Sequence, residues 1–475
     1  MSAPPSFCPR SGPDQALSAG GTPHRRRFAF VGTGHRAELY FAALLGDHAD
    51  AGVPVAVCDT NPTRMAYYQR RWYQARPGTP GLAAYGADDL GDMLDRERPD
   101  TVVVASVDRW HARHVTAALD RGCDVICEKP LAVDVDGCQS IVAAAGRSDG
   151  ELTVGFNYRY APRNSAVKEL LAAGSVGTVT SVHFEWLLDT VHGADYFRRW
   201  HRDRRNSGGL LVHKSSHHFD LVNWWLDDVV DGVYAQAQLS FYGAAHRQDP
   251  APFAIDLAAD DRLRRLYVDA RADDGYRRDL SPFAPGVTIE DNMAVLARYR
   301  GGALLTYSLN AHAPWEGYRV GINGTEGRVD LAVCERPAVE PGAAERIVGG
   351  NDRRRRGQAR RTVDDVRPAA AELVVQRHWE RAERVPIEQT EAGHGGGDTR
   401  FLEDLFGTAA GPPDPLGRRA GYGDGVRSVL VGIAANQSVA TGRPVRLADL
   451  GLPFCVLDLT EKAGVRVPRT GGIQR

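Results

Sequence analysis

Two histidines, His213 and His217, stand four residues apart in the stretch VHKSSHHFDLVNWW, residues 212–225. Residues at this spacing share one face of a helix, so a zinc ion, a proton-transfer reaction or a buried structural pair could use them. Lys214 follows His213 where the zinc motif H-E-x-x-H has glutamate, and its charge disfavours a metal. We therefore predict no metal and interpret the pair as a proton-transfer site, with a structural pair as the alternative.

A glycine pattern, GTGHRA, follows the apolar run FAFV and opens a segment with helical spacing. Gly32 permits a tight turn, and Gly34 lets the backbone approach a diphosphate at the helix N-terminus. Asp59 ends the next apolar run, VPVAVCD, where a carboxylate accepts hydrogen bonds from an adenosine ribose. Because that carboxylate repels a 2′-phosphate, the pattern favours NAD over NADP, although Arg64 nearby could accommodate the phosphate.

Strands and helices alternate from residue 28 to about residue 150. Apolar runs at 53–59, 100–106 and 123–130 predict buried strands, and helical patterns lie between them. The alternation predicts a doubly wound parallel sheet, so we assign residues 27–150 to a Rossmann dinucleotide-binding domain. Residues 1–26, rich in Pro, Ser, Gly and Ala, are predicted to form a disordered leader.

The pattern changes after residue 150. Strand-like runs separated by glycine-containing turns predict an α/β domain with a large, open, mostly antiparallel sheet over 151–450. Two insertions interrupt it, a polar one at 244–286 and one at 336–370 that contains the run NDRRRRGQARR, which we interpret as solvated. Residues 451–475 are assigned to a C-terminal tail.

Composition limits the partners. The chain has 475 residues, and 58 Lys+Arg against 60 Asp+Glu give a net charge of 58 − 60 = −2, which attracts neither nucleic acid nor an anionic membrane. No apolar run reaches the roughly 20 residues that cross a bilayer. The seven cysteines form no C-x-x-C pair, so we expect reduced thiols and a cytoplasmic protein acting on a small molecule.

Three ordered motifs carry a resemblance to a known family. They are ASVDRWH (105–111), CEKP (127–130) and GFNYRY (155–160), and together with the glycine turn they resemble the Gfo/Idh/MocA oxidoreductases. The resemblance covers residues 28 to about 331. It implies a Rossmann domain joined to an α/β domain for substrate and oligomerisation, with an open sheet that often makes a subunit interface. We therefore expect a homo-oligomer, a dimer or a tetramer.

The resemblance also implies residue roles. Lys129 would lie between nicotinamide and substrate, where a cation stabilises a developing alkoxide, and the proline matching Pro130 is often cis. His217 matches the family's catalytic histidine, while His213 stands where aspartate is usual and Val107 where proline is common. We predict Lys129, His217 and His213 as catalytic. The predicted cofactor-binding residues are Gly32, Thr33, Gly34, His35, Arg36, Asp59, Arg64, Ser106, Asp108, His111, Glu128, Lys129 and Asn157.

The substrate is predicted from an aromatic and basic segment, residues 184–209. Aromatic faces stack on sugar rings, and arginine or histidine donors suit hydroxyls or a carboxylate, so we expect a carbohydrate, cyclitol or related polyol. The alternative is that half of these residues are core aromatics and surface charges. The predicted substrate-binding residues are Arg159, Trp200, Lys214, Trp315 and His394.

A glycine-dense loop, GHGGGD (393–398), leaves a second activity open. It resembles the G-H-G-G-x-D segment of NAD-dependent N-acetylgalactosaminidases, which oxidise a sugar hydroxyl transiently, eliminate the aglycone, add water and reduce the ring again. Three functions therefore remain: hydride transfer between a polyol hydroxyl and NAD(P), redox-neutral glycoside hydrolysis, and non-catalytic nucleotide or sugar sensing.

Overall fold

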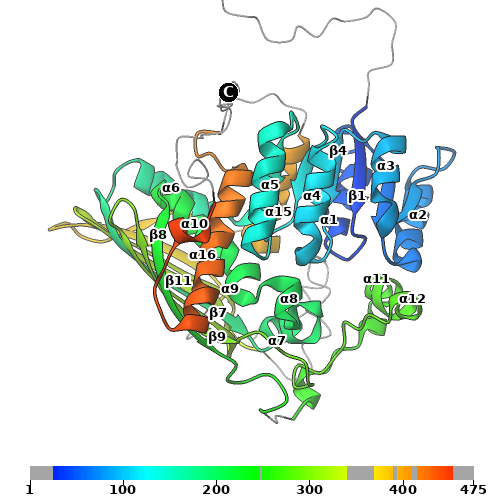
Figure 1. The fold of residues 1–475 in the computed structure, drawn as a ribbon. Coiled ribbons are helices and arrows are strands. Elements are labelled where there is room, and N and C mark those ends of the chain that lie inside the picture. Colours follow the sequence, from blue (N-terminus) through cyan, green and yellow to red (C-terminus); the bar gives the residue numbers. More distant parts are fainter. Residues whose placement is uncertain (1–24, 247–248, 340–367, 389–392, 408–413, 453–475) are drawn as a thin grey trace, which may run out of the picture.

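The computed structural model describes residues 25–246, 249–339, 368–388, 393–407 and 414–452. The predicted leader (except residues 25 and 26), the arginine run and the tail beyond residue 452 lie outside these ranges. No helix in the described part is both long and apolar enough to span a membrane. The chain forms two sheets with helices between and around them (Figure 1).

The first sheet is the predicted parallel, doubly wound sheet. Its strands, in spatial order, are β15 (Ala420–Gly421), β6 (Leu152–Val154), β5 (Asp124–Cys127), β4 (Thr101–Val104), β1 (Arg27–Val31), β2 (Val53–Asp59) and β3 (Ala83–Gly86). All pairs are parallel except that between β15 and β6. Its helices are α1 (Ala37–Leu45), α2 (Pro62–Ala75), α3 (Leu90–Glu97), α4 (His111–Leu119) and α5 (Val135–Arg147).

Burial explains why the sequence signal for this sheet is strong. Every residue of β4 is buried, as expected for a strand covered by helices on both faces. Strand β3, which the sequence did not predict, has no fully buried residue and therefore lacks the apolar run that marks the others.

The second sheet is large and mostly antiparallel, as predicted. Its strands, in spatial order, are β14 (Glu383–Val385), β13 (Ala371–Arg377), β12 (Gly327–Arg336), β11 (Glu316–Gly324), β7 (Val179–Asp189), β10 (Leu304–Ala313), β9 (Asn292–Tyr299), β8 (Val230–Gln238) and β16 (Val445–Arg446). Only β7 and β10 pair in parallel. The two sheets together confirm the predicted α/β fold class.

The two faces of the second sheet differ. Side chains alternate along each strand, so Phe184 and Trp186 point to one face and His183 and Glu185 to the other. On the first face Trp186 stacks on His218 at a ring-centroid distance of 4.1 Å. The helices of this half are α6 (Pro162–Ala172), α7 (His192–Arg198), α8 (Arg204–Ser207), α9 (Leu210–His213), α10 (Ser215–Leu226), α15 (Gly397–Phe406) and α16 (Tyr422–Thr441). Among the described residues, α10 and α16 lie over this face and no helix lies over the opposite one (Figure 1).

Helix α16 joins the two halves. It packs on β8 of the second sheet and on α5 and β6 of the first. Gly432 lies in its middle, where a Cβ atom would come within 2.2 Å of the carbonyl oxygen of Leu211, so glycine allows α16 to approach α9 closely. Because α16 also contacts α10, this packing fixes α9, which ends at His213, and α10, which carries His217, relative to the dinucleotide-binding sheet.

The insertion predicted at 244–286 folds back onto the first half. We call residues 249–286 the strap; it contains α11 (Asp261–Leu263), a π-helical turn η7 (Arg264–Asp269) and α12 (Arg271–Asp274). Its apolar residues Leu263, Leu266, Tyr267 and Ala270 are buried, and η7 contacts α2. Figure 1 shows α11 and α12 below α2. The strap is therefore a packed element of the Rossmann half, although its sequence looked merely polar.

Candidate active site

The glycine turn lies between β1 and α1. Gly32 has φ +89°, and a Cβ atom there would come within 2.6 Å of the amide nitrogen of Ser106. Glycine is therefore required both by the backbone conformation and by the loop that follows β4. Helix α1 begins at Ala37, directly after this turn, and a helix N-terminus favours an anion such as a diphosphate.

Asp59 is held at the end of β2, beside this turn. One carboxylate oxygen accepts hydrogen bonds from the amide of Thr33 at 2.6 Å and from its hydroxyl at 2.8 Å, and the other accepts from the amide of Asn61 at 2.9 Å. A glycine turn that leads into a helix, with a carboxylate at the end of the next strand, is the arrangement that a dinucleotide needs. The residues present therefore fit the cofactor.

Arg64 lies near Asp59, as predicted, but it has a second carboxylate partner. Its guanidinium is 3.6 Å from Asp59 and forms an ion pair with Asp274 of the strap. Burial opposes its charge, yet these two carboxylates raise the pKa of Arg64 overall. The positive charge of Arg64 is thus neutralised by carboxylates of the protein itself.

Glu128, at the end of β5, ties the E-K-P segment to α1. Its carboxylate accepts hydrogen bonds from Arg36 at 2.5 Å and from the Tyr40 hydroxyl at 2.6 Å. Arg36 also lies 3.7 Å from Asp398, which accepts a 2.6 Å hydrogen bond from Asn157. The glycine-dense loop therefore packs against the predicted cofactor residues.

His111 supports the same segment from the loop after β4. Its ring nitrogens contact the carbonyl oxygens of Pro130 at 2.7 Å and of Ser106 at 3.1 Å. The Lys129–Pro130 peptide is cis, in agreement with the family resemblance. Burial lowers the pKa of His111, so we interpret this residue as a neutral brace for the turn that presents Lys129.

The ammonium group of Lys129 meets His213, not a residue of its own domain. Nζ of Lys129 lies 3.2 Å from Nε2 of His213 and donates to its carbonyl oxygen at 3.1 Å. Nδ1 of His213 lies 2.5 Å from a carboxylate oxygen of Asp108. A charged Lys129 donates to Nε2, so the imidazole proton is then on Nδ1 and faces Asp108. We call Lys129, His213 and Asp108 the catalytic junction, after the catalytic role predicted for Lys129 and His213.

Burial shifts all three titrations. It lowers the pKa of Lys129 to about 8, although Asp108 and Glu128 act to raise it. Burial, together with the charge of Lys129, lowers the pKa of His213 well below its usual range. Burial raises the pKa of Asp108, and Lys129 opposes that rise. His213 therefore stays neutral. The pKa of Lys129 is close enough to neutral pH for this side chain to exchange a proton.

His217 follows His213 by one helical turn and faces an aromatic wall. Its ring stacks on Tyr158 at a centroid distance of 4.3 Å and lies edge-on to Phe156 at 5.9 Å. The Tyr158 hydroxyl accepts a 3.1 Å hydrogen bond from Lys214, whose ammonium group also lies 4.8 Å from the centre of the Trp186 ring. Burial and Lys129 lower the pKa of Lys214 to about 7.

Of the predicted substrate residues, Trp200 is brought to the catalytic junction. Its ring stacks on His201 at 3.5 Å and lies edge-on to His213 at 6.0 Å. It also lines a hollow of about 400 Å³ between the strap and the short 3₁₀ turn η4 (Trp200–Arg202). Two neighbouring arginines are used differently from the prediction, because Arg198 and Arg202 donate to carbonyl oxygens of the strap.

The structure does not bring Arg159 and Trp315 to this hollow. Arg159 forms a two-pronged ion pair with Asp220 at 2.8 and 2.6 Å, and both side chains are buried. Removing one partner of such a buried pair costs about 3–5 kcal/mol of stability, so Arg159 has a structural role. Trp315 is buried against the backbone of β11 at Gly317. The side chain of His394 lies outside the described part of the chain.

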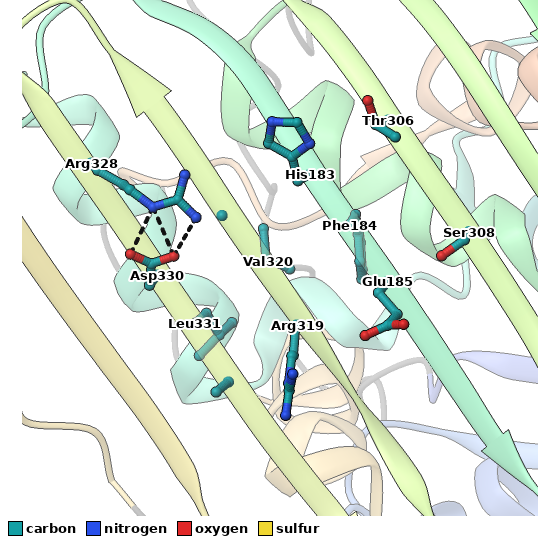
Figure 2. Close-up of a pocket in the computed structure, with 12 residues that line it drawn as sticks. His183, Phe184, Glu185, Thr306, Ser308, Arg319, Val320, Arg328, Asp330 and Leu331 are labelled. Atoms are coloured by element: carbon teal, nitrogen blue, oxygen red, sulfur yellow. Dashed lines mark hydrogen bonds and ion pairs between the residues drawn. The ribbon is translucent and has the colours of Figure 1, made fainter. Parts of the chain in front are cut away.

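A second hollow, of about 330 Å³, lies on the uncovered face of the second sheet (Figure 2). Figure 2 shows His183 and Glu185 from β7 and Thr306 from β10 beside the ion pair of Arg328 with Asp330. This face is opposite to the one on which α10 packs. The hollow is therefore separate from Lys129 and from the histidines.

Three residues of the strap reach the site and were not predicted: Tyr267, Asp274 and Arg278. The Tyr267 hydroxyl accepts a 2.8 Å hydrogen bond from the amide of His35 in the glycine turn. A signal was present, because the apolar residues of the strap at positions 263, 266, 267 and 270 have the i, i+3, i+4, i+7 spacing of an amphipathic helix. Which surface that helix covers could not be read from the spacing.

Two family models match the chain. One, described as the NAD-binding Rossmann fold of an oxidoreductase family, matches residues 26–156. The other, described as the C-terminal alpha/beta domain of an oxidoreductase family, matches residues 168–447. The first match ends just after β6, and the second begins within α6.

Individual proteins agree with these matches. The oxidoreductase YteT of Bacillus subtilis strain 168 is 32% identical over 461 residues, covering 90% of this chain and 98% of YteT. Inositol 2-dehydrogenase 3 of Saccharopolyspora erythraea is 31% identical over 239 residues, 50% of this chain and 64% of that enzyme. A levoglucosan dehydrogenase solved with NADH and levoglucosan has a TM-score of 0.59 at 19% identity, covering 89% of this chain and 100% of that chain, and shows the same fold.

Proposed function

Because this chain belongs to the Gfo/Idh/MocA oxidoreductase family, we propose that it transfers a hydride between a sugar, cyclitol or related polyol hydroxyl and NAD. The observation that carries the proposal is the catalytic junction, in which Lys129 at the edge of the dinucleotide-binding sheet meets His213 of the second half at 3.2 Å. A nicotinamide bound there supplies the hydride acceptor. Relatives named for inositol and levoglucosan support the substrate class.

In this proposal the protein's own residues accept the proton of the substrate hydroxyl and stabilise the charge that develops on its oxygen. Lys129 holds the substrate oxygen and stabilises negative charge that develops on it. His217 accepts the hydroxyl proton, since it stands at the position of the family's catalytic histidine and its ring stacks on Tyr158. His213 and Asp108 position Lys129, while burial lowers its pKa against the opposing charge of Asp108.

The structure supports NAD over NADP. Arg64 is the cation near Asp59, and Asp274 of the strap forms an ion pair with it. A 2′-phosphate would therefore face two carboxylates and only one arginine. We assign Asp59 and Asp274 as the residues that disfavour NADP.

The substrate is assigned to the hollow beside Trp200. Its indole offers a face for the C–H groups of a ring, and Asn206 and Arg199 line the same hollow. An open hollow lined by an aromatic face and polar groups suits a polyol better than an apolar alcohol.

Redox-neutral glycoside hydrolysis remains a second candidate. It is favoured by the position of the loop 393–398, where Asp398 accepts a hydrogen bond from Asn157 beside the cofactor residues. Asp398 is buried and bonded within this cluster, which supports a structural role equally well.

One experiment separates the candidates. Purified protein with NAD is offered free polyols, cyclitols and nitrophenyl glycosides while absorbance is followed at wavelengths specific for NADH and for nitrophenol. NADH formation with a polyol supports the dehydrogenase. Nitrophenol release without net NADH would establish the hydrolase instead, and neither signal across the panel would favour a sensing protein.

We also propose that the uncovered face of the second sheet is the subunit interface of a homo-oligomer. Leu296 on β9 and Leu304 on β10 are each 55% exposed there. The double variant Leu296→Asp, Leu304→Asp is expected to convert the oligomer to monomer, measured by light scattering after size exclusion. Tyr73→Ser, which removes an exposed aromatic from α2, is the control and should leave the mass unchanged. A natural protein that is already monomeric would refute the interface.

A further inference from the structure

The strap is attached to the dinucleotide-binding half at the end of β2 and the start of α2. The side chain of Asn61 donates to the carbonyl oxygen of Ala270 at 2.8 Å, and Asp273 accepts from the amide of Thr63 at 3.1 Å. Leu266 is fully buried in the same apolar cluster as residues of α1 and α2. The strap is thus held in a fixed position over the glycine turn.

Tyr267 of the strap occupies the anion-binding end of α1. Its hydroxyl accepts the hydrogen bond of the His35 amide at 2.8 Å, and a Cβ atom on Gly34 would lie 3.5 Å from that hydroxyl. The amides at this helix end are the groups that a diphosphate oxygen binds in a dinucleotide fold. The tyrosine oxygen therefore marks a place that suits a phosphate oxygen.

Arg278 lies behind this tyrosine and is buried with spare donors. Its side chain is 3% exposed, and its guanidinium carbon is 4.8 Å from the centre of the Tyr267 ring. Nη2 is 3.6 Å from Asp195, a carboxylate already bonded to Arg199 at 2.7 Å. Among the described residues, Nε and Nη1 of Arg278 have no hydrogen-bond partner. A buried cation with unused donors is costly unless an anion completes it.

The glycine turn itself supplies little free positive charge. Burial lowers the pKa of His35 well below its usual range, and the charge of Arg278 lowers it further, so His35 is neutral. Arg36 is paired with Glu128. Arg278 is linked to the turn through Tyr267, because its guanidinium lies over the ring whose hydroxyl bonds the His35 amide. A diphosphate bound at the turn would therefore find its uncompensated cation in the strap.

We propose that the strap forms a second half of the diphosphate site, in which Arg278 and the hydroxyl of Tyr267 bind the dinucleotide's diphosphate opposite the glycine turn. On binding, a phosphate oxygen replaces the tyrosine hydroxyl as acceptor of the His35 amide. This inference rests on the dinucleotide site of the proposed function, but it concerns binding alone and requires no hydride transfer.

The test is the affinity of Arg278→Gln for two probes, ADP-ribose and adenosine, measured by displacement of NADH fluorescence or by calorimetry. ADP-ribose contains the diphosphate and adenosine does not. We expect at least a tenfold loss of ADP-ribose affinity and less than a twofold change for adenosine. Arg265→Gln is the matched control, because Arg265 lies on the same strap, is exposed and pairs only with Asp261 among the described residues. It should bind both probes normally.

Other outcomes decide against the inference. Equal weakening for both probes would mean that Arg278 only supports the fold, and unchanged ADP-ribose affinity would remove it from the site. If Arg278→Gln does not fold, Arg278→Lys keeps the charge and should bind ADP-ribose within about threefold of the natural protein; a tenfold loss there, with adenosine affected equally, overturns the proposal. An enzyme that binds ADP-ribose through Arg278 yet oxidises no polyol would refute the proposed function and leave this inference standing.

Discussion

The glycine turn and the catalytic junction both lie at the ends of strands of the first sheet, but they bring together very different lengths of chain. Thr33 and Asp59 are separated by 26 residues and belong to one βαβ unit. Lys129 and His213 are separated by 84 residues, and His213 and Asp108 by 105. The pairing of the glycine turn with Asp59 is therefore a local product of one folding unit, to which the strap adds Tyr267, whereas the catalytic junction exists only where two halves of the molecule pack together.

The difference separates binding from chemistry. A change in the catalytic junction should abolish turnover while the dinucleotide still binds, because the glycine turn is complete without it. A change near the glycine turn should alter the choice or affinity of the nucleotide while leaving the catalytic junction assembled. The predictions below test this separation.

The largest effect is expected for Lys129→Met. Removal of a donor that stabilises developing negative charge lowers turnover by about 10²–10³-fold, and loss of the local cation adds to that. We expect kcat to fall by at least that factor while the dissociation constant for NADH, measured by fluorescence, changes less than about threefold. A comparable loss of NADH affinity would show that the two regions are not separable.

The two histidines should differ. His217→Gln is expected to lower kcat by about 10²–10⁴-fold, the usual contribution of a general base, because the imidazole that we propose as the proton acceptor is lost. His213→Asp restores the residue that the family usually has and should retain much more activity than His213→Leu. His48→Gln, on the far side of the first half, is the control. If His213→Gln proves as damaging as His217→Gln and His213→Asp rescues nothing, His213 is itself the base.

Nucleotide choice should respond to the strap. Asp274→Asn frees Arg64 from one of its two carboxylates, so the ratio of kcat/KM for NADP to that for NAD should rise by roughly tenfold. Asp273→Asn removes the same charge from the adjacent position, where the carboxylate accepts from a backbone amide. It should raise the ratio much less. If the two variants raise the ratio equally, the change reflects the loss of one negative charge in this region and not the release of Arg64.

The smallest effect expected is on the pH profile. The pKa of Lys129 is lowered to about 8 by burial, so the side chain is charged below that pH and neutral above it. If the cation assists catalysis, kcat/KM should decline by severalfold between pH 8 and pH 9. In Lys129→Arg the charge persists, so the remaining activity should not show that decline. If the pH profiles of the natural protein and of Lys129→Arg have the same shape, the decline of kcat/KM above pH 8 belongs to another titrating group.

The sequence predicted the parts of this protein that depend on short-range pattern. Apolar runs and their spacing determined the two sheets and the domain order, and the glycine turn with Asp59 could be assigned because each signal lies within one supersecondary unit. Motif resemblance identified Lys129 and the histidines as a group. The short strand β3 escaped because its residues are only partly buried, so its composition carries no apolar signal.

Only the tertiary structure decided which distant side chains come into contact. It placed His213 between Lys129 and Asp108, withdrew Arg159 into an ion pair with Asp220, and folded the strap so that Tyr267 reaches an amide 232 residues away in sequence. Periodicity in a sequence reveals that a segment has an apolar face but not which surface covers that face. Those contacts are settled by packing between distant elements, and the proposed chemistry depends on them.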